Sequence, residues 1–128
     1  MSFDPQDRIP SISVVNFDKL DALRRMDPAG GADFLKRLVG IFLASTPGAV
    51  MRIEAAIQAD DRIGMIQAVH SLRSSAANVG AEQLSDICRL LEDSGDHLQK
   101  KDIVELLSKL QHEFQLVTIA LQDLQKDF

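Results

Sequence analysis

The residues best suited to chemistry in this chain surround His70, in the segment AVHSLRSSAANVGA at residues 68–81. Arg73 follows His70 by three residues and Ser74 by four, so both lie one helical turn from the imidazole. A neutral imidazole is a nucleophile near neutral pH because its ordinary pKa is about 6.5. A phosphoryl group on it would carry close to two negative charges, which a nearby guanidinium can neutralise. The spacing therefore predicts a histidine that carries a phosphoryl group.

Winding the segment at about 100° per residue predicts two distinct faces. One is an apolar stripe with the width of a core face, made of Met65, Ala68, Val69, Leu72, Ala76 and Val79. The opposite face holds His70 together with Ile63, Ile66, Gln67, Arg73, Ser74 and Ala77. Apolar residues around a polar centre are typical of a protein-docking surface. We therefore expect a partner to bind over His70, with Ile63, Ile66 and Ala77 as docking residues.

Two small residues are expected to serve this contact. Ser74 leaves little bulk beside the ring, so a partner's active site could approach in line with the imidazole nitrogen. Gly80 permits the left-handed turn that ends the helix and lets the next helix pack closely. The other two histidines, His97 and His112, lack such neighbours and are expected to be ordinary surface residues.

The segment HSLRSSAANVGA resembles the histidine-phosphotransfer (HPt) signature, usually written H-x-L-K-G-S-x-x-x-x-G-A. The matching residues are His70, Leu72, Ser75, Gly80 and Ala81. Arg73 stands where the family usually has lysine, which keeps the charge but replaces a point ammonium with a planar fork. Ser74 stands where the family usually has glycine. The resemblance extends over residues 16–126.

The resemblance implies that His70 accepts a phosphoryl group from the aspartyl phosphate of a response-regulator receiver domain and passes it to another receiver. It implies that this chain holds no cofactor, because the partner receiver supplies the Mg²⁺. It also implies that the chain is a phosphocarrier without an ATP site rather than a kinase. A hybrid sensor histidine kinase is a further implied partner.

In some members a polar residue 22 positions after the histidine orients the ring, and here that residue is Glu92. If Glu92 accepted the Nδ1 proton, Nε2 would be the nucleophile; a solvent-facing glutamate fits the sequence equally well. Gln67, Gly80 and Glu92 are the supporting residues.

Two rival functions stay open at this point. The chain could be a non-catalytic helical interaction module that docks a receiver-like partner through its apolar patch. It could also be a hydrolytic enzyme with a phosphohistidine intermediate, for which Glu92 is the only water-activating base that the sequence offers near His70.

Composition narrows the class of protein. The net charge of −5 argues against nucleic-acid binding, which needs a basic patch. We find no apolar run long enough to cross a bilayer, no signal peptide, and no metal-ligand cluster or nucleotide-binding glycine motif. The single cysteine, Cys88, is expected to fill the core. These features predict a cytoplasmic protein without membrane contact of its own, or the cytoplasmic C-terminal domain of a membrane-bound hybrid kinase.

The fold class expected is all-α, an antiparallel up-down-up-down four-helix bundle with a short N-terminal helix. Residues 1–15 are expected to form a flexible leader or linker stub, and residues 16–128 the bundle. Helices are predicted near 16–25, 32–60, 62–78, 81–94 and 101–126, with Pro47 kinking or restarting the second. The inward residues predicted for the first two are Phe17, Leu20, Leu23, Phe34, Leu38, Ile41, Phe42, Met51, Ile53, Ala56 and Ile57. A 3.5-residue apolar repeat from Ile103 to Leu124 marks the last helix as a bundle seam.

Overall fold

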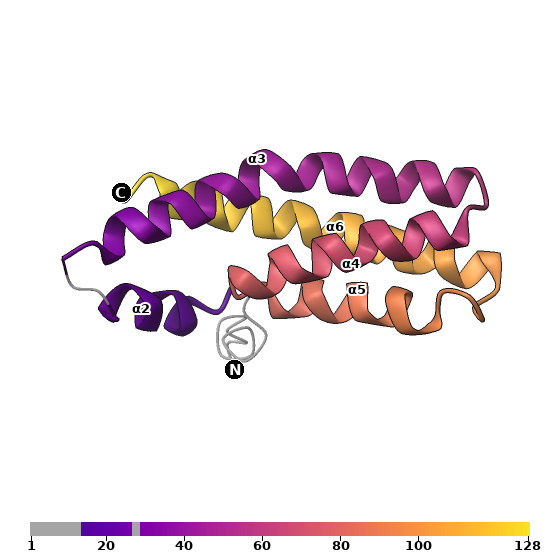
Figure 1. Cartoon of the computed structure of the whole chain (residues 1–128), viewed down its shortest axis with the longest axis horizontal. Helices are drawn as coiled ribbons and strands as arrows, with labels where there is room; N and C mark the ends of the chain where they lie inside the picture. The colour runs from indigo at the N-terminus through magenta and orange to yellow at the C-terminus, as the bar shows by residue number, and fades with distance from the viewer. Residues whose placement is uncertain (1–13, 27–28) are drawn as a thin grey trace, which may run out of the picture.

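The computed structural model describes residues 14–26 and 29–128, and within these ranges all regular structure is helical. The helices are α2 (Phe17–Arg25), α3 (Gly31–Gln58), α4 (Arg62–Asn78), α5 (Glu82–Ser94) and α6 (Lys100–Gln125). Figure 1 shows α3 to α6 running side by side along the long axis, with the short α2 beside one end. Each long helix contacts two others, since α3 packs on α4 and α6, and α5 packs on the same pair. The predicted four-helix bundle with a short N-terminal helix is confirmed.

The bundle begins slightly earlier in the chain than expected. Val15 is fully buried and Val14 packs against the core, so these two residues of the predicted 1–15 leader belong to the bundle. The rest of that leader, residues 1–13, lies outside the described residues. Asn16 caps α2, because its side chain accepts a hydrogen bond from the Lys19 backbone N–H at 3.1 Å.

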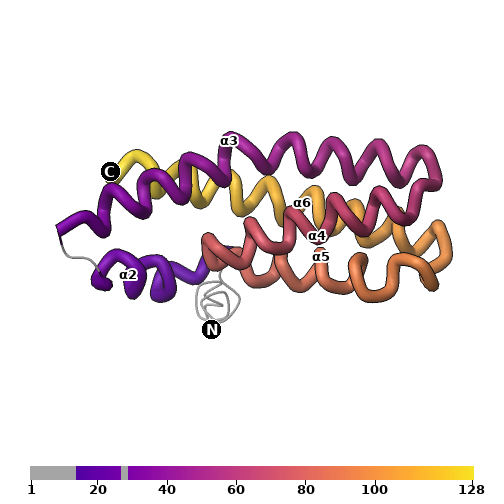
Figure 2. The backbone as a smooth tube through the Cα atoms, viewed as in Figure 1, coloured from indigo at the N-terminus to yellow at the C-terminus, as the bar shows by residue number. Residues whose placement is uncertain are grey.

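The helix α3 continues through Pro47 without a break, which settles the choice between a kinked and a restarted helix. Proline has no N–H to donate to the preceding turn. Beside it, the Ser45 and Thr46 hydroxyls donate to the carbonyls of Ile41 and Phe42 at 2.8 and 2.6 Å. The tube in Figure 2 changes direction near the middle of α3, as expected where proline interrupts the hydrogen-bond ladder.

The predicted inward face of α3 is partly wrong. Phe34, Ile41 and Met51 are exposed, as is Phe17 in α2. Phe42, Ile53 and Ile57 are buried as predicted. The other buried residues of α3 are Gly31, Leu35, Val39, Thr46, Ala49 and Val50. Apolar residues occur on several faces of α3, so periodicity alone allowed more than one rotation. Contacts with α4 and α6 select the rotation that is observed.

By length and composition α3 could cross a membrane, so the expectation that no apolar run reaches that length is wrong. The core helix of a soluble protein can have the same length and composition. In this structure α3 packs against α2, α4 and α6 and contributes more buried residues than any other described helix.

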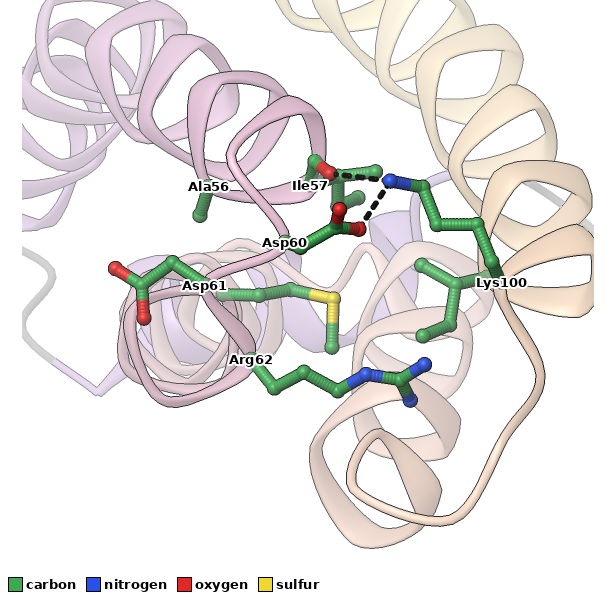
Figure 3. Close-up of a pocket in the computed structure, with 8 residues that line it drawn as sticks. Ala56, Ile57, Asp60, Asp61, Arg62 and Lys100 are labelled. Atoms are coloured by element: carbon green, nitrogen blue, oxygen red, sulfur yellow. Dashed lines mark hydrogen bonds and ion pairs between the residues drawn. The ribbon is translucent and has the colours of Figure 1, made fainter.

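The helix α4, which carries His70, is fixed at both ends. At its start the Asp61 side chain accepts a hydrogen bond from Gly64 N–H at 2.9 Å. Lys100 holds the preceding turn, because its ammonium donates to the Ile57 carbonyl at 3.0 Å and pairs with Asp60 (Figure 3). Arg62 donates to the carbonyls of Gly95 and Leu98 at 2.6 and 2.5 Å and so joins the start of α4 to the α5–α6 connection.

The predicted apolar stripe of α4 is confirmed, since all six of its residues are buried. On the neighbouring helices the buried set includes Leu84, Leu91, Leu110 and Val117. Cys88 is fully buried, and burial raises the pKa of its thiol to about 12, in keeping with the predicted core role. The rotation of α4 about its axis, and therefore the direction of His70, is set by this packing.

At the other end of α4, Gly80 has a φ of +75°, as the sequence predicts. A β-carbon there would lie 3.1 Å from the carbonyl oxygen of Asn16.

We expect Gly80→Ala to lower the free energy of unfolding by about 1–3 kcal/mol, because a non-glycine residue is strained at this φ. Gly40 is the control, since a β-carbon there meets nothing within 4 Å. Gly40→Ala should be neutral or stabilising by about 0.5–1 kcal/mol. Urea unfolding of both variants measures this, and equal stabilities would contradict it.

Candidate functional site

His70 lies midway along α4 on the side opposite the buried stripe, and 56 % of its side chain is exposed. The first functional requirement inferred from the sequence, an imidazole open to a partner, is therefore met. Ser74, one turn further on, is also exposed. The ring is thus flanked on this side by a small residue.

The helix α5 brings Glu92 to the imidazole. Glu92 Oε2 lies 2.5 Å from His70 Nδ1, and the Glu92 side chain is only 19 % exposed. The alternative of a solvent-facing glutamate is therefore wrong. A carboxylate can only accept hydrogen bonds, so the contact requires the proton to be on Nδ1. In the neutral ring this leaves the lone pair on Nε2.

Arg73 completes a cluster of three side chains with His70 and Glu92. Its Nε lies 2.6 Å from Glu92 Oε1, as an ion pair outside hydrogen-bond alignment, and its Nη2 lies 3.4 Å from His70 Nδ1. The sequence placed Arg73 beside the ring, but its pairing with Glu92 could not be read from spacing within α4. The guanidinium therefore approaches the ring on the side of the nitrogen that faces α5.

Gln67 is exposed and lies on the side of α4 that faces α3. It lines an open groove there together with Arg52, Ala55, Gly64 and Ser71. The side-chain contacts recorded at the imidazole come from Glu92 and Arg73 instead. The structure thus brings Glu92 to His70 and leaves Gln67 beside the groove.

The three predicted docking residues differ in exposure. Ile63 is 72 % exposed and lies in the first turn of α4. Ile66 is half-buried and packs against the core, near Gly95 at the end of α5, so its assignment to the free surface is only partly right. Ala77 is also half-buried. Its carbonyl accepts a hydrogen bond at 2.6 Å from Lys19 of α2, a neighbour that the local pattern of α4 gives no means of finding.

Over residues 14–26 and 29–128, no group of three or more His, Cys, Asp or Glu side chains is placed to hold a metal ion.

Comparisons with known proteins match the chain to one family. The sequence model of the Hpt domain matches residues 37–126, a shorter span than the 16–126 of the signature-based resemblance. Histidine-containing phosphotransfer protein 5 of Arabidopsis thaliana is 23 % identical over 124 residues, which cover 93 % of this chain and 79 % of the relative.

Solved structures show the same fold. The crystal structure of histidine-containing phosphotransfer protein B from Pseudomonas aeruginosa superposes with a TM-score of 0.81 at 22 % identity, covering 91 % of this chain and 97 % of that one. The HPT domain of a sensor hybrid histidine kinase from Shewanella gives a TM-score of 0.76 at 17 % identity, with coverages of 90 % and 96 %. The family match takes in most of α3 and all of α4, α5 and α6, and it includes His70, Arg73 and Glu92. The chain therefore belongs to the Hpt domain family, whose members are phosphotransfer carriers of phosphorelays rather than kinases.

Proposed function

We propose that this chain is the histidine-phosphotransfer intermediate of a two-component phosphorelay, with His70 as phosphoacceptor. The observation that carries the proposal is the exposed imidazole whose Nδ1 contacts Glu92, because this arrangement leaves Nε2 as the nucleophile. A receiver domain with an aspartyl phosphate docks over His70. The Nε2 lone pair forms the N–P bond while the P–O bond to the aspartate breaks, and the aspartate leaves as a carboxylate.

The reverse of this step loads a second receiver, whose aspartate attacks the phosphorus and releases the imidazole. The protein's contribution is positioning and charge stabilisation rather than covalent activation. Mg²⁺ belongs to the receiver in this proposal, and the chain needs no ATP site because the phosphoryl donor is already a protein. Its setting is the cytoplasm, as a free carrier or as the C-terminal domain of a membrane-bound hybrid kinase.

The proposal has two rivals that one experiment separates. Incubation with a receiver labelled at its aspartate should give an acid-labile phosphate on this chain, which a pure interaction module would not acquire. A phosphatase would release inorganic phosphate steadily without a second receiver. Glu92, the base that the sequence offers near His70, already contacts both His70 and Arg73, so it is poorly placed to activate a water.

Ser74 tests whether small size beside the ring serves partner approach. We expect Ser74→Gln to slow receiver-dependent labelling at least tenfold, because a long side chain one turn from His70 prevents closure of the receiver over the ring. Labelling by phosphoramidate, a small donor, should stay near the wild-type rate. Ser71→Gln is the matched control, since Ser71 is exposed on the same helix but faces the groove toward α3. Equal slowing with both donors would show that the substitution acts on the histidine rather than on docking.

A further inference from the structure

The carboxylate of Glu92 has two partners, one for each oxygen. Oε2 contacts His70 Nδ1 at 2.5 Å, and Oε1 contacts Arg73 Nε at 2.6 Å. His70 and Arg73 come from consecutive turns of α4, whereas Glu92 comes from α5. The glutamate therefore bridges the histidine and the arginine across the α4–α5 interface.

The proton on Nδ1 decides how Arg73 acts on the ring. The 2.5 Å contact with Glu92 requires Nδ1 to be the donor. Arg73 Nη2, at 3.4 Å from the same nitrogen, also has only hydrogens to offer. A protonated ring nitrogen has no lone pair for a second donor, so the Arg73 contact is not a hydrogen bond in this tautomer. The hydrogen-bonded contact to Nδ1 is therefore that of Glu92, and Arg73 reaches this contact through its ion pair with Glu92.

The burial of the contacting atoms of Arg73 and Glu92 also supports a role of Arg73 through Glu92. Among the described residues, Arg73 Nε and Glu92 Oε1 are shut off from solvent and have no aligned hydrogen-bond partner, so the charge of each is balanced through their ion pair. The Arg73 side chain as a whole is 35 % exposed and that of Glu92 19 %, so removing Arg73 leaves a largely buried carboxylate without its ion-pair partner. Without Arg73, the Glu92 carboxylate would gain by turning toward water, away from Nδ1. The ion pair is thus what keeps Glu92 against the imidazole.

We propose that Arg73 is a positioning residue that holds Glu92 against Nδ1 of His70, and through it fixes the ring tautomer that presents Nε2 to phosphorus. This inference rests on the proposed phosphocarrier function for its consequence in transfer. It differs from the charge-compensation role expected from the sequence, in which Arg73 would act directly on the phosphoryl oxygens and independently of Glu92.

The first test is spectroscopic and needs neither phosphate nor a partner. Two-dimensional ¹H–¹⁵N spectra of the imidazoles distinguish the Nδ1–H tautomer from the Nε2–H tautomer in the unphosphorylated protein. We expect His70 to be predominantly Nδ1–H in the wild type and a mixture of both tautomers in Arg73→Ala. Arg73→Lys should restore the wild-type pattern, because an ammonium can still pair with Glu92. Arg89→Ala is the control, since Arg89 is an exposed arginine on α5 that pairs with Asp86.

The second test is a double-mutant cycle on receiver-dependent labelling. We expect Arg73→Ala and Glu92→Gln each to slow labelling about tenfold, and the double variant to be no slower than the worse single one. If the effects multiply to about a hundredfold, and the tautomer of Arg73→Ala stays as in the wild type, Arg73 acts directly on the phosphoryl group and the inference is wrong. Circular dichroism confirms that each variant is folded.

The two proposals fail in different ways. If wild-type protein takes no phosphate from any receiver, yet Arg73→Ala still changes the ring tautomer, the phosphocarrier function is refuted and the positioning role stands. If wild-type protein is labelled normally and Arg73→Ala leaves the ring unchanged, the carrier function stands and the positioning role is refuted.

Discussion

His70→Gln is expected to abolish phosphate uptake from a phosphorylated receiver while leaving the bundle intact. The imidazole supplies the only nucleophile in the proposed mechanism, and an amide nitrogen has no lone pair available to attack phosphorus. The side chain is 56 % exposed, so the free energy of unfolding should change by less than about 0.5 kcal/mol. Acid-labile label, thermal unfolding and helicity are the measurements.

His97→Gln and His112→Gln are the matched controls for this prediction. Both histidines lie on the exposed surface, His97 in the α5–α6 connection and His112 on α6. Both variants should take up phosphate as the wild type does. Normal labelling of His70→Gln would refute the carrier role of His70, and loss of labelling in either control would move the site elsewhere while keeping the class of protein.

The part of the site that lies within α4 could be predicted because the side chains of one helix point outward in a fixed, regular repeat. Six apolar residues mark its buried stripe, and the opposite face follows from geometry alone. His70, Ser74 and the exposed Ile63 therefore lie where the pattern places them. The turn at Gly80 could be predicted for a similar reason, since only glycine adopts its φ without strain.

Features that depend on a second element could not be read in this way. The pairing of Arg73 with Glu92 requires the distance between α4 and α5, which periodicity does not supply. Ile66 has the angular position of a surface residue, but the end of α5 covers part of it. Lys19 reaches the end of α4 from a helix 58 residues earlier in the sequence. In each case the position follows from packing between elements rather than from the pattern within one.

A negative charge on the buried face of α4 should unfold the domain, whereas the same charge on its exposed face should weaken receiver binding. Leu72 is fully buried, and we expect Leu72→Asp to unfold the domain, because an unpaired carboxylate in the core costs several kcal/mol, a large part of the roughly 5–15 kcal/mol by which a domain is stable. Leu72→Met, which nearly conserves volume, should cost less than about 1.5 kcal/mol and shows that an apolar side chain suffices there. Urea unfolding measures both.

Ile63→Asp places the same charge on the proposed docking surface, where the side chain is 72 % exposed. We expect no loss of stability, since an acidic residue in the first turn of a helix interacts favourably with the helix dipole. Receiver affinity should fall about tenfold or more, because an apolar contact is replaced by a charge that must be desolvated on binding. Ile66→Asp should lower both the free energy of unfolding and the affinity for the receiver in part, because Ile66 is half-buried. If Ile63→Asp binds the receiver as tightly as the wild type, the docking surface does not extend to the first turn of α4.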